Sequence, residues 1–266
     1  MTRLLQTPTE VWLTGAGSGM GYQLATRLIE GGHRLRVSGR RTSSLLALRE
    51  LAPDRVRILP VDITDPAAVA ALADPLMVPA PVQLAILNAG TCEYLDATHF
   101  QGRVIANNIN TNLLGTAHCI EAVLPALRRA RHSGLPAALV IVSSSAWWFP
   151  FSRAEGYGAS KAALSYLAHS LRADLACEGI EVVTVSPGFV KTPLTDANDF
   201  PMPFRIPAEQ AAEKILAGLR SGRRDIHFPR RFTWLLKALR ALPQPLVDRL
   251  AARMARSSAA HQETSL

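Results

Sequence analysis

Short runs of β-branched residues and leucine alternate with longer stretches in which apolar residues recur every three or four positions. The first pattern predicts buried strands and the second predicts amphipathic helices. Strands are expected at Val11–Thr14, Arg34–Ser38, Val56–Pro60, Leu84–Asn88, Ala138–Ser143, Ile180–Ser186 and Asp225–Phe228. Helices are expected near residues 20–30, 43–52, 66–76, 103–131, 158–178 and 208–221. This alternation predicts an α/β fold, in which a doubly wound parallel sheet of about seven strands carries helices on both faces.

The alternation ends near residue 230, which divides the sequence into an α/β domain, 1–230, and a helical tail, 231–266. Before that point, the proline-rich stretch Thr192–Pro207 predicts a loop or short helices. Two amphipathic helices are expected in the tail, separated by Pro243 and Pro245. Their expected apolar faces consist of Phe232, Leu235, Leu236, Leu239 and Leu242 in the first, and of Leu246, Val247, Leu250 and Met254 in the second. The end, from Ser257 to Leu266, is small and polar, which predicts fraying.

Composition narrows the class of protein. Hydrophobic residues occupy 48% of the 266 positions, which is enough for a sizeable core and excludes general disorder. The three cysteines show no paired spacing and the seven histidines are scattered, which predicts a reducing compartment without a disulfide framework or a metal site. No signal-peptide pattern is visible, and no uninterrupted apolar stretch reaches the ~20 residues that a spanning helix needs. We therefore expect a soluble, cytoplasmic protein.

The net charge of +8 is concentrated at the C-terminal end. From Arg220 onward the chain has ten basic residues against three acidic ones, Asp225, Asp248 and Glu263. A nucleic-acid function would have to reside in this tail, and no recognition motif appears there, so nucleic acid is not an expected partner. Three interpretations of the tail stay open. It packs on the domain as a lid, lies on an anionic membrane surface, or forms a contact between subunits.

A glycine-rich stretch comes directly after the first predicted strand and opens the first predicted helix. In this context Gly15 permits a tight turn, Gly19 lets the backbone approach a pyrophosphate, and Gly21 lets the helix pack closely on the strand. Free N–H groups at the helix start favour phosphate. The alternative is a merely flexible turn. The residues expected to contact a dinucleotide here are Thr14, Gly15, Gly17, Ser18, Gly19, Met20 and Gly21.

Arg40 and Arg41 come after the second predicted strand and bear on which dinucleotide is bound. NAD enzymes tend to carry an acidic residue here that bonds the ribose 2′-hydroxyl, and Gly39 stands where that acid is expected. Two guanidinium groups suit a 2′-phosphate instead. The alternative is that both arginines are solvated residues at the start of the next helix. We expect the cofactor to be NADP(H).

Tyr157 and Lys161 are four residues apart at the start of a predicted helix, so both side chains lie on one face. The ordinary pKa of tyrosine, near ~10, is too high for easy proton exchange at neutral pH. A nearby ammonium favours the phenolate and brings the hydroxyl into a useful range. This spacing alone also occurs by chance in many helices, so its meaning depends on the surrounding motifs.

Taken in order, these motifs resemble those of the short-chain dehydrogenase/reductase family over about residues 8–230. The resemblance implies a Rossmann-type fold and hydride transfer between nicotinamide and a carbonyl or alcohol. It implies that Ser144 bonds the substrate oxygen, with Ser143 and Ser145 as competing candidates. It also implies that Asn112, otherwise a buried helix-bending residue, holds a water in a proton relay to the lysine. Further implied cofactor contacts, besides Tyr157 and Lys161, are Asp62, Ile63, Asn88, Ala89, Gly90, Pro187, Gly188, Val190 and Thr192.

The substrate compartment is expected beside Ser144, between Cys92–Tyr94 and the loop 193–206. A third wall is expected from the segment after Ser144, which is strongly apolar and favours a bulky hydrophobic ketone or alcohol. The tryptophans of this segment are equally expected to brace a loop or an oligomer contact instead. The residues of this expected wall are Ala146, Trp147, Trp148, Phe149 and Phe151.

Related enzymes pair through the long helices near 103–131 and 158–178, so a homodimer or homotetramer is expected. Two rival functions remain. The chain is either a non-catalytic NADP sensor or scaffold of the same fold, or an epimerase or dehydratase acting on nucleotide sugars. The complete Ser/Tyr/Lys/Asn set argues against the first rival, although a fold never guarantees activity. The second needs a larger C-terminal substrate domain, for which the chain has little room.

Overall fold

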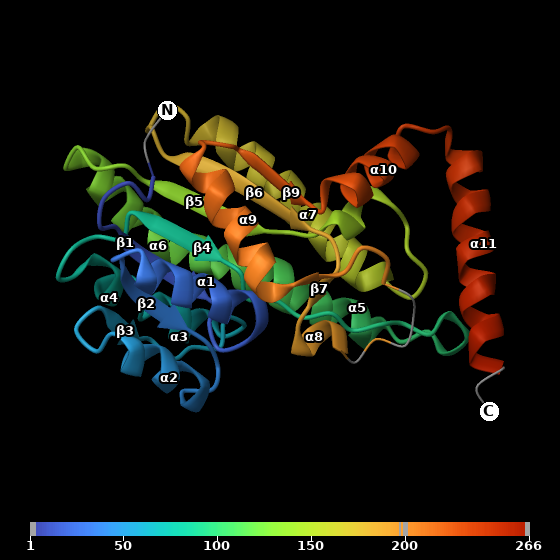
Figure 1. The fold of residues 1–266 in the computed structure, drawn as a ribbon, viewed down its shortest axis with the longest axis horizontal. Coiled ribbons are helices and arrows are strands. Elements are labelled where there is room, and N and C mark those ends of the chain that lie inside the picture. The colour runs from blue at the N-terminus through green and yellow to red at the C-terminus, as the bar shows by residue number, and fades with distance from the viewer. Residues whose placement is uncertain (1–3, 197, 199–201, 264–266) are drawn as a thin grey trace.

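Seven parallel strands form one sheet in the computed structural model, which describes residues 4–196, 198 and 202–263 (Figure 1). The strand order is β3-β2-β1-β4-β5-β6-β9. The chain runs outward from β1 to β3 and then returns to the other side of β1, so the order reverses between β1 and β4. Each predicted strand is present, with ends within two residues of the prediction. The strands are β1 (Glu10–Thr14), β2 (Arg34–Ser38), β3 (Val56–Ile58), β4 (Leu84–Leu87), β5 (Ala138–Val142), β6 (Glu181–Pro187) and β9 (Asp225–Phe228).

Helices connect the strands, and two of the predicted helices are interrupted. The helix expected over 66–76 is two short helices, α3 (Pro66–Ala70) and α4 (Ala73–Met77). The helix expected over 103–131 contains a π-helical turn, η2 (Asn110–Leu114), between α5 (Gly102–Ile109) and α6 (Gly115–His132). The other main helices are α1 (Gly19–Glu30), α2 (Ser43–Leu51), α7 (Glu155–Asp174) and α9 (Ala208–Arg220).

Short elements fill the connections. The described part of the stretch 192–207 contains α8 (Pro193–Asp196) and ends in β8 (Ile206–Pro207), which pairs with β7 (Val190–Lys191). The short helices predicted there are thus found, together with a strand pair that was not predicted. Two 3-10 turns, η1 (Ala97–His99) and η3 (Ser145–Trp148), lie in the connections after β4 and β5.

The tail forms two helices at one end of the molecule, α10 (Arg230–Arg240) and α11 (Gln244–Glu263) (Figure 1). Pro243 precedes α11, whereas Pro245 lies in its first turn, where a missing N–H has no cost. The helix continues to Glu263 instead of fraying from Ser257, and residues 264–266 lie outside the described part. The predicted apolar faces are only partly buried. Phe232, Leu236 and Val247 are buried, and Leu239 and Leu250 are half-buried, whereas Leu235, Leu242, Leu246 and Met254 are exposed.

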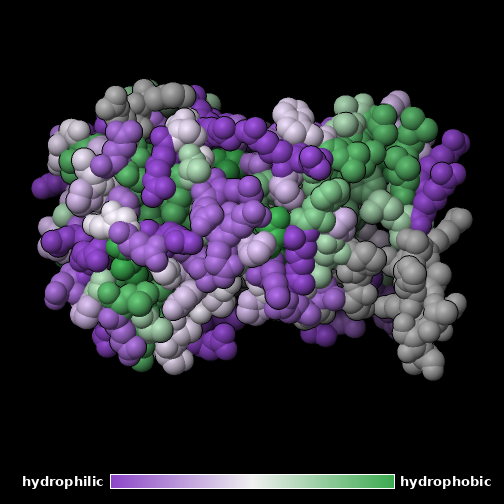
Figure 2. All heavy atoms as spheres, viewed as in Figure 1, coloured by the Kyte–Doolittle hydropathy of each residue, from purple (hydrophilic) through white to green (hydrophobic). Residues whose placement is uncertain are grey.

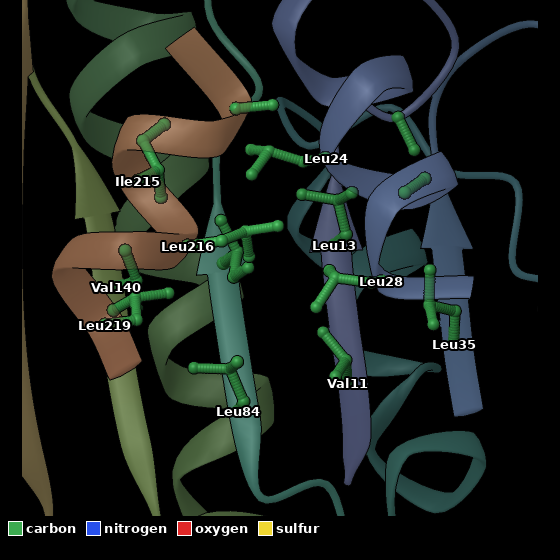
Figure 3. Close-up of a cluster of buried hydrophobic side chains, with 14 of the residues drawn as sticks. Val11, Leu13, Leu24, Leu28, Leu35, Leu84, Val140, Ile215, Leu216 and Leu219 are labelled. Atoms are coloured by element: carbon green, nitrogen blue, oxygen red, sulfur yellow. The ribbon is translucent and has the colours of Figure 1, made fainter. Parts of the chain in front are cut away.

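Alternating side chains of the central strands β1, β4, β5 and β6 enter two separate cores, one on each face of the sheet. Val11 and Leu13 of β1 face α1 and α9, whereas Trp12 between them faces α4 and α6. The same alternation holds in β4 and β5, because successive side chains of a strand point to opposite faces. Both faces of these central strands are therefore buried, whereas Arg34 of β2 and Arg57 of β3 are exposed at the edge of the sheet. Figure 3 shows the first core, where Leu24 and Leu28 of α1 and Ile215, Leu216 and Leu219 of α9 cover Val11, Leu13, Leu35, Leu84 and Val140.

Candidate active site

A cleft of about 500 Å³ lies at the carboxyl ends of the parallel strands. It includes the point where the strand order reverses between β1 and β4, which is where open α/β sheets bind ligands. Twenty of the residues predicted as site residues line it: Gly15, Gly17, Ser18, Gly19, Met20, Gly21, Arg40, Arg41, Asp62, Ile63, Asn88, Ala89, Gly90, Ser144, Tyr157, Lys161, Pro187, Gly188, Val190 and Thr192. Thr14 and Asn112 do not line it. Both lie behind the lining residues and hydrogen-bond to the backbone that forms the cleft.

The glycine turn between β1 and α1 has no room for side chains. Gly15 has φ +67°, a left-handed conformation that favours glycine. A Cβ on Gly21 would lie 2.1 Å from the Gly15 carbonyl oxygen and 2.6 Å from Asn88 Nδ2. The Thr14 hydroxyl holds the neighbouring strand end, since it accepts hydrogen bonds from the backbone N–H groups of Asn88 and Ala89, both at 3.1 Å. Thr14 is therefore buried and positions this turn instead of facing the cleft.

The start of α1 presents its backbone to the cleft. Ser18 is the N-cap residue, and its side chain makes no capping hydrogen bond. The N–H groups of the first turn therefore keep their capacity to bind an anion, and the positive end of the helix dipole adds to it. The backbone is accessible here because Gly17 and Gly19 have no side chains, and there is no free space for one. A Cβ on Gly19 would lie 2.9 Å from the Thr192 methyl carbon.

Two arginines and one aspartate form another part of the cleft wall. Arg40 and Arg41 are exposed, and neither has an acidic partner within ion-pair distance in the described part of the chain. Asp62 accepts hydrogen bonds from the Thr64 N–H at 3.0 Å and the Thr64 hydroxyl at 2.8 Å. The backbone hydrogen bond is the largest cause of the lowered pKa of Asp62, and the charge of Arg40 contributes. The cleft thus holds two free guanidinium groups near one ionised carboxylate.

Tyr157 reaches the cleft from the first turns of α7, and its hydroxyl hydrogen-bonds the Ser144 side chain at the end of β5. Ser144 Oγ also accepts from the Ala146 N–H at 3.1 Å, which fixes its orientation. Burial raises the pKa of Tyr157, and the hydrogen bond to Ser144 opposes that rise. The phenol is therefore neutral at neutral pH and carries a proton that it can donate.

The structure separates the three consecutive serines. Ser143 Oγ donates to the Lys161 backbone carbonyl at 2.8 Å and lies 2.8 Å from Ser165 Oγ, so its hydroxyl is committed to α7. Ser145 is buried and does not line the cleft. Ser144 is the serine whose side chain meets Tyr157, and its role in bonding the substrate oxygen stays a prediction.

Lys161 is buried beneath Tyr157. Its ammonium donates to the Val142 carbonyl at 3.1 Å and lies 5.7 Å from the centre of the Tyr157 ring. Burial lowers the pKa of Lys161 to about 8. The sequence argument expected the ammonium to lower the pKa of Tyr157, but burial dominates and both groups shift toward their neutral forms. Gly90 provides the space above the amine, since a Cβ there would lie 3.4 Å from Lys161 Nζ.

Asn112 lies in the π-helical turn η2 and is fully buried. Its side chain clamps the backbone of Thr91, accepting from the N–H at 2.8 Å and donating to the carbonyl at 3.0 Å. It also donates to Ser160 Oγ at 2.9 Å, which joins it to α7. Asn112 was predicted to hold a water through its side chain. In the structure, both the oxygen and the nitrogen of its amide already form hydrogen bonds with protein groups. Its visible role is to fix Thr91 and α7 around the cleft.

The segment Cys92–Tyr94 was predicted to form a wall of the substrate compartment, and of its three residues Glu93 lines the cleft while Cys92 and Tyr94 do not. The side chains of Cys92 and Tyr94 hydrogen-bond each other, and both interact electrostatically with Tyr157. Burial raises the pKa of Cys92, so the thiol is neutral at neutral pH. Glu93, Leu194 and Thr195 line the cleft itself. From the loop 193–206, residues 197 and 199–201 lie outside the described part.

The predicted third wall of the substrate compartment is wrong. The segment after Ser144 turns away from the cleft and lines a separate groove of about 590 Å³, which it shares with α7, α10 and α11. Trp148 and Phe149 are buried against Phe232 and Leu236 of α10. Lys237 and Arg240 of α10 lie 4.8 Å and 4.2 Å from the ring centres of Trp148 and Trp147. This segment therefore anchors the tail. The sequence pattern showed that the segment is apolar, but it could not show that the apolar face of α10 would be its packing partner.

Polar residues of α5 and η2 line the cleft and were not predicted: Asn107, Asn110 and Thr111. The sequence carries no signal for them, because they belong to a stretch that the pattern assigned to an ordinary connecting helix. Ser38, Val61, Thr64, Thr91 and Val142 also line the cleft, and their adjacency to predicted motifs could have identified them.

Residues 9–200 match the family model described as short chain dehydrogenase. The chain belongs to this family of oxidoreductases. A relative from Myxococcus xanthus, named an uncharacterized oxidoreductase, is 36% identical over 248 residues, which cover 91% of this chain and 96% of the relative. Sulfoacetaldehyde reductase 2 from Chromohalobacter salexigens is 34% identical over 70% of this chain and 74% of its own length.

Solved structures show the same architecture. A short chain dehydrogenase from Burkholderia cenocepacia in complex with NADP superposes with a TM-score of 0.80 at 25% identity, covering 94% of this chain and 99% of that one. A short-chain dehydrogenase from Sphingobium yanoikuyae in complex with NADPH gives a TM-score of 0.74 at 26% identity, covering 90% and 97%. The similarity of the Burkholderia structure extends over most of the chain, including much of the region beyond residue 200. No helix among the described residues is long and apolar enough to span a membrane.

Proposed function

We propose that this protein is an NADP(H)-dependent oxidoreductase that interconverts a carbonyl and an alcohol. The observation that carries the proposal is the hydrogen bond between the Tyr157 hydroxyl and Ser144, with the Lys161 amine buried beneath the tyrosine. These groups lie in a cleft large enough for a dinucleotide. In this proposal residues 1–230 form the catalytic unit and residues 231–266 form a basic helical tail.

The cleft offers groups that suit four parts of a phosphorylated dinucleotide. The glycine turn and the start of α1 would hold the pyrophosphate, since backbone N–H groups and glycines without room for a Cβ face the cleft there. Arg40 and Arg41 would hold the 2′-phosphate, and Asp62 the adenine. Val190 and Thr192, which line the cleft after β6, would hold the nicotinamide carboxamide. The two family members solved with NADP and NADPH support this choice of cofactor.

Bound NADPH would supply a hydride to the carbonyl carbon of the substrate. Ser144 and Tyr157 would both hydrogen-bond the carbonyl oxygen, which orients the carbonyl and stabilises the negative charge that develops on it. Tyr157 would then donate its proton to that oxygen, which completes the alcohol. The ammonium form of Lys161 predominates at neutral pH, because the pKa of about 8 lies above it, and its charge favours the phenolate that Tyr157 leaves. A relay through Lys161, a water and Asn112 that would return the proton stays a prediction, because both side-chain atoms of Asn112 hydrogen-bond to Thr91 and Ser160.

The substrate proposed is a small carbonyl compound. The prediction of a bulky hydrophobic substrate stays a prediction, and it loses the support of the aromatic segment after Ser144, which packs on the tail. A homodimer or homotetramer formed through α6 and α7 is also proposed. Tyr166 on the outer side of α7 supports it, since 77% of this large side chain is exposed.

Replacing Tyr157 tests the proposal. Tyr157→Phe should reduce the turnover of NADPH with a panel of aldehydes and ketones by about 1,000-fold, because the proton donor is lost. NADPH affinity, measured by fluorescence titration, should change less than about twofold, because the ring is retained. Tyr166→Phe, on the same helix, should leave both unchanged. Equal loss of turnover and NADPH affinity in Tyr157→Phe would contradict the assigned role.

Cofactor choice is tested separately. The double variant Arg40→Ala/Arg41→Ala should weaken NADPH binding by about 100-fold while changing NADH binding little, because only the 2′-phosphate is lost as a contact. Arg49→Ala, an exposed position on α2, serves as the control. Parallel weakening of both nucleotides would contradict a 2′-phosphate site. Tight NADPH binding by the wild type without oxidation by any carbonyl compound would favour the non-catalytic sensor.

A further inference from the structure

The outward face of α10 is apolar although nothing in the described part of the chain covers it. Trp234 is 60% exposed and Leu235 is 52% exposed. Ala238 and Ala241 are exposed on the same side, since they recur at helical spacing. Leu242 and Leu246 extend this surface into the start of α11, with 38% and 44% of their side chains exposed. We call these six residues the outer tail surface, and Figure 2 shows the hydrophobic region over α10 and the beginning of α11.

The opposite face of α10 fixes this surface in place. Phe232 and Leu236 are buried in a cluster with Trp148, Phe149 and Val247. Thr233 is fully buried and its hydroxyl lies 2.8 Å from His227 Nδ1 at the end of the sheet. The helix is thus held to the domain by one apolar face while it presents a second one outward. An isolated amphipathic surface helix needs only one apolar face, so the second requires a separate explanation.

The charge beside this surface is strongly positive. Between residues 230 and 254 the chain has six basic residues and one acidic residue. Arg230 and Arg231 begin α10, and Arg249 and Arg253 lie on α11. Lys237 and Arg240 of α10 lie over the rings of Trp148 and Trp147. No ion pair to any of these six is formed within the described residues. An exposed tryptophan and leucines beside cations that have no acidic partner match the chemistry of a bilayer with anionic headgroups.

We propose that α10 and the start of α11 dock this enzyme on an anionic lipid bilayer through the outer tail surface. The apolar residues enter the boundary between headgroups and acyl chains, and the cations contact lipid phosphates. A second copy of the chain is a poorer occupant, because joining two outer tail surfaces would bring twelve cations together with two acidic groups. The docked helix lies in the plane of the membrane and does not cross it.

Vesicle sedimentation tests the proposal with the full-length protein. Wild-type protein should co-sediment with vesicles of phosphatidylcholine and phosphatidylglycerol, and much less with pure phosphatidylcholine. The variant Trp234→Ser/Leu235→Ser should lower the partition coefficient by about tenfold, because two side chains no longer enter the bilayer. Arg231→Gln/Arg249→Gln should also lower it by about tenfold and weaken its dependence on salt, because both exposed cations lie outside the contacts that anchor α10.

A matched control changes two exposed leucines far from the tail. Leu46→Ser/Leu51→Ser, on α2, removes similar exposed apolar surface and should leave vesicle binding unchanged. NADPH titration of each variant shows that the domain is folded, and it does not depend on vesicles. Equal binding to neutral and anionic vesicles, or equal loss in the α2 control, would overturn the proposal. So would the absence of vesicle binding together with a wild-type dimer that the Trp234→Ser/Leu235→Ser variant dissociates in sedimentation velocity, which would assign the surface to a second copy.

Discussion

Burying the Lys161 amine costs stability, and replacing it by a neutral side chain of similar shape should make the protein more stable while it loses activity. The side chain is only 4% exposed, and burial lowers its pKa from 10.5 to about 8. A shift of this size corresponds to roughly 3 kcal/mol of penalty on the charged form. Lys161→Met removes that penalty, but it also leaves the Val142 carbonyl without its donor, which costs about 1 kcal/mol. The net expectation is a gain of about 2 kcal/mol in the free energy of unfolding at pH 7.

The gain should also depend on pH in a defined interval. Between pH 8 and pH 10.5 the amine is neutral in the folded protein but still protonated in the unfolded chain, so the unfolded state binds more protons. The unfolding free energy of the wild type therefore rises with pH across this interval through this group. The advantage of Lys161→Met should be constant below pH 8 and should shrink as the pH approaches 10.5.

Urea unfolding of the cofactor-free proteins at several pH values measures both effects. Lys214→Met on the exposed side of α9 is the matched control, and it should show no comparable gain at any pH. Turnover by Lys161→Met should be lost throughout. A Lys161→Met variant that is less stable than the wild type at pH 7, or a gain that does not change above pH 8, would show that the buried amine is not the cost inferred from the structure.

Further predictions concern the glycine turn and the tail. Gly21→Ala should destabilise the protein by about 2 kcal/mol and weaken NADPH binding by at least about tenfold, because its Cβ would lie 2.1 Å from the Gly15 oxygen. Gly102→Ala, which meets nothing within 4 Å, should do neither, and equal thermal melting of the two variants would contradict the argument. Trp148→Ala should lower the unfolding free energy by about 3 kcal/mol, as measured in urea, because the ring is buried against α10. Trp234→Ala removes an exposed ring and should cost less than about 1 kcal/mol; the reverse order would refute the packing described for α10.

The local pattern of the sequence was sufficient for the sheet and for most of the cleft. The central strands β1, β4 and β5 carry apolar residues along both faces, and that pattern survives in any parallel sheet covered on both sides. Some site residues contact near neighbours in sequence or residues at the ends of adjacent strands. These are Gly15, Gly21, Tyr157 and Lys161. Contacts of this kind follow from local sequence and strand order alone, so the positions of these residues in the cleft were predictable.

Tertiary structure alone decided the rest. Asn112 was expected to face a water, but its amide bonds to Thr91 and Ser160, which the fold brings to it from distant parts of the chain. The aromatic segment at Trp148 could have lined the cleft or supported another element, and the choice depended on α10, which lies more than eighty residues later in the chain. Helical periodicity shows which residues share a face, but burial depends on what packs against that face. For this reason the sequence located the pair Tyr157/Lys161, which we propose to be reactive, whereas only the folded chain showed which of its apolar surfaces remain uncovered.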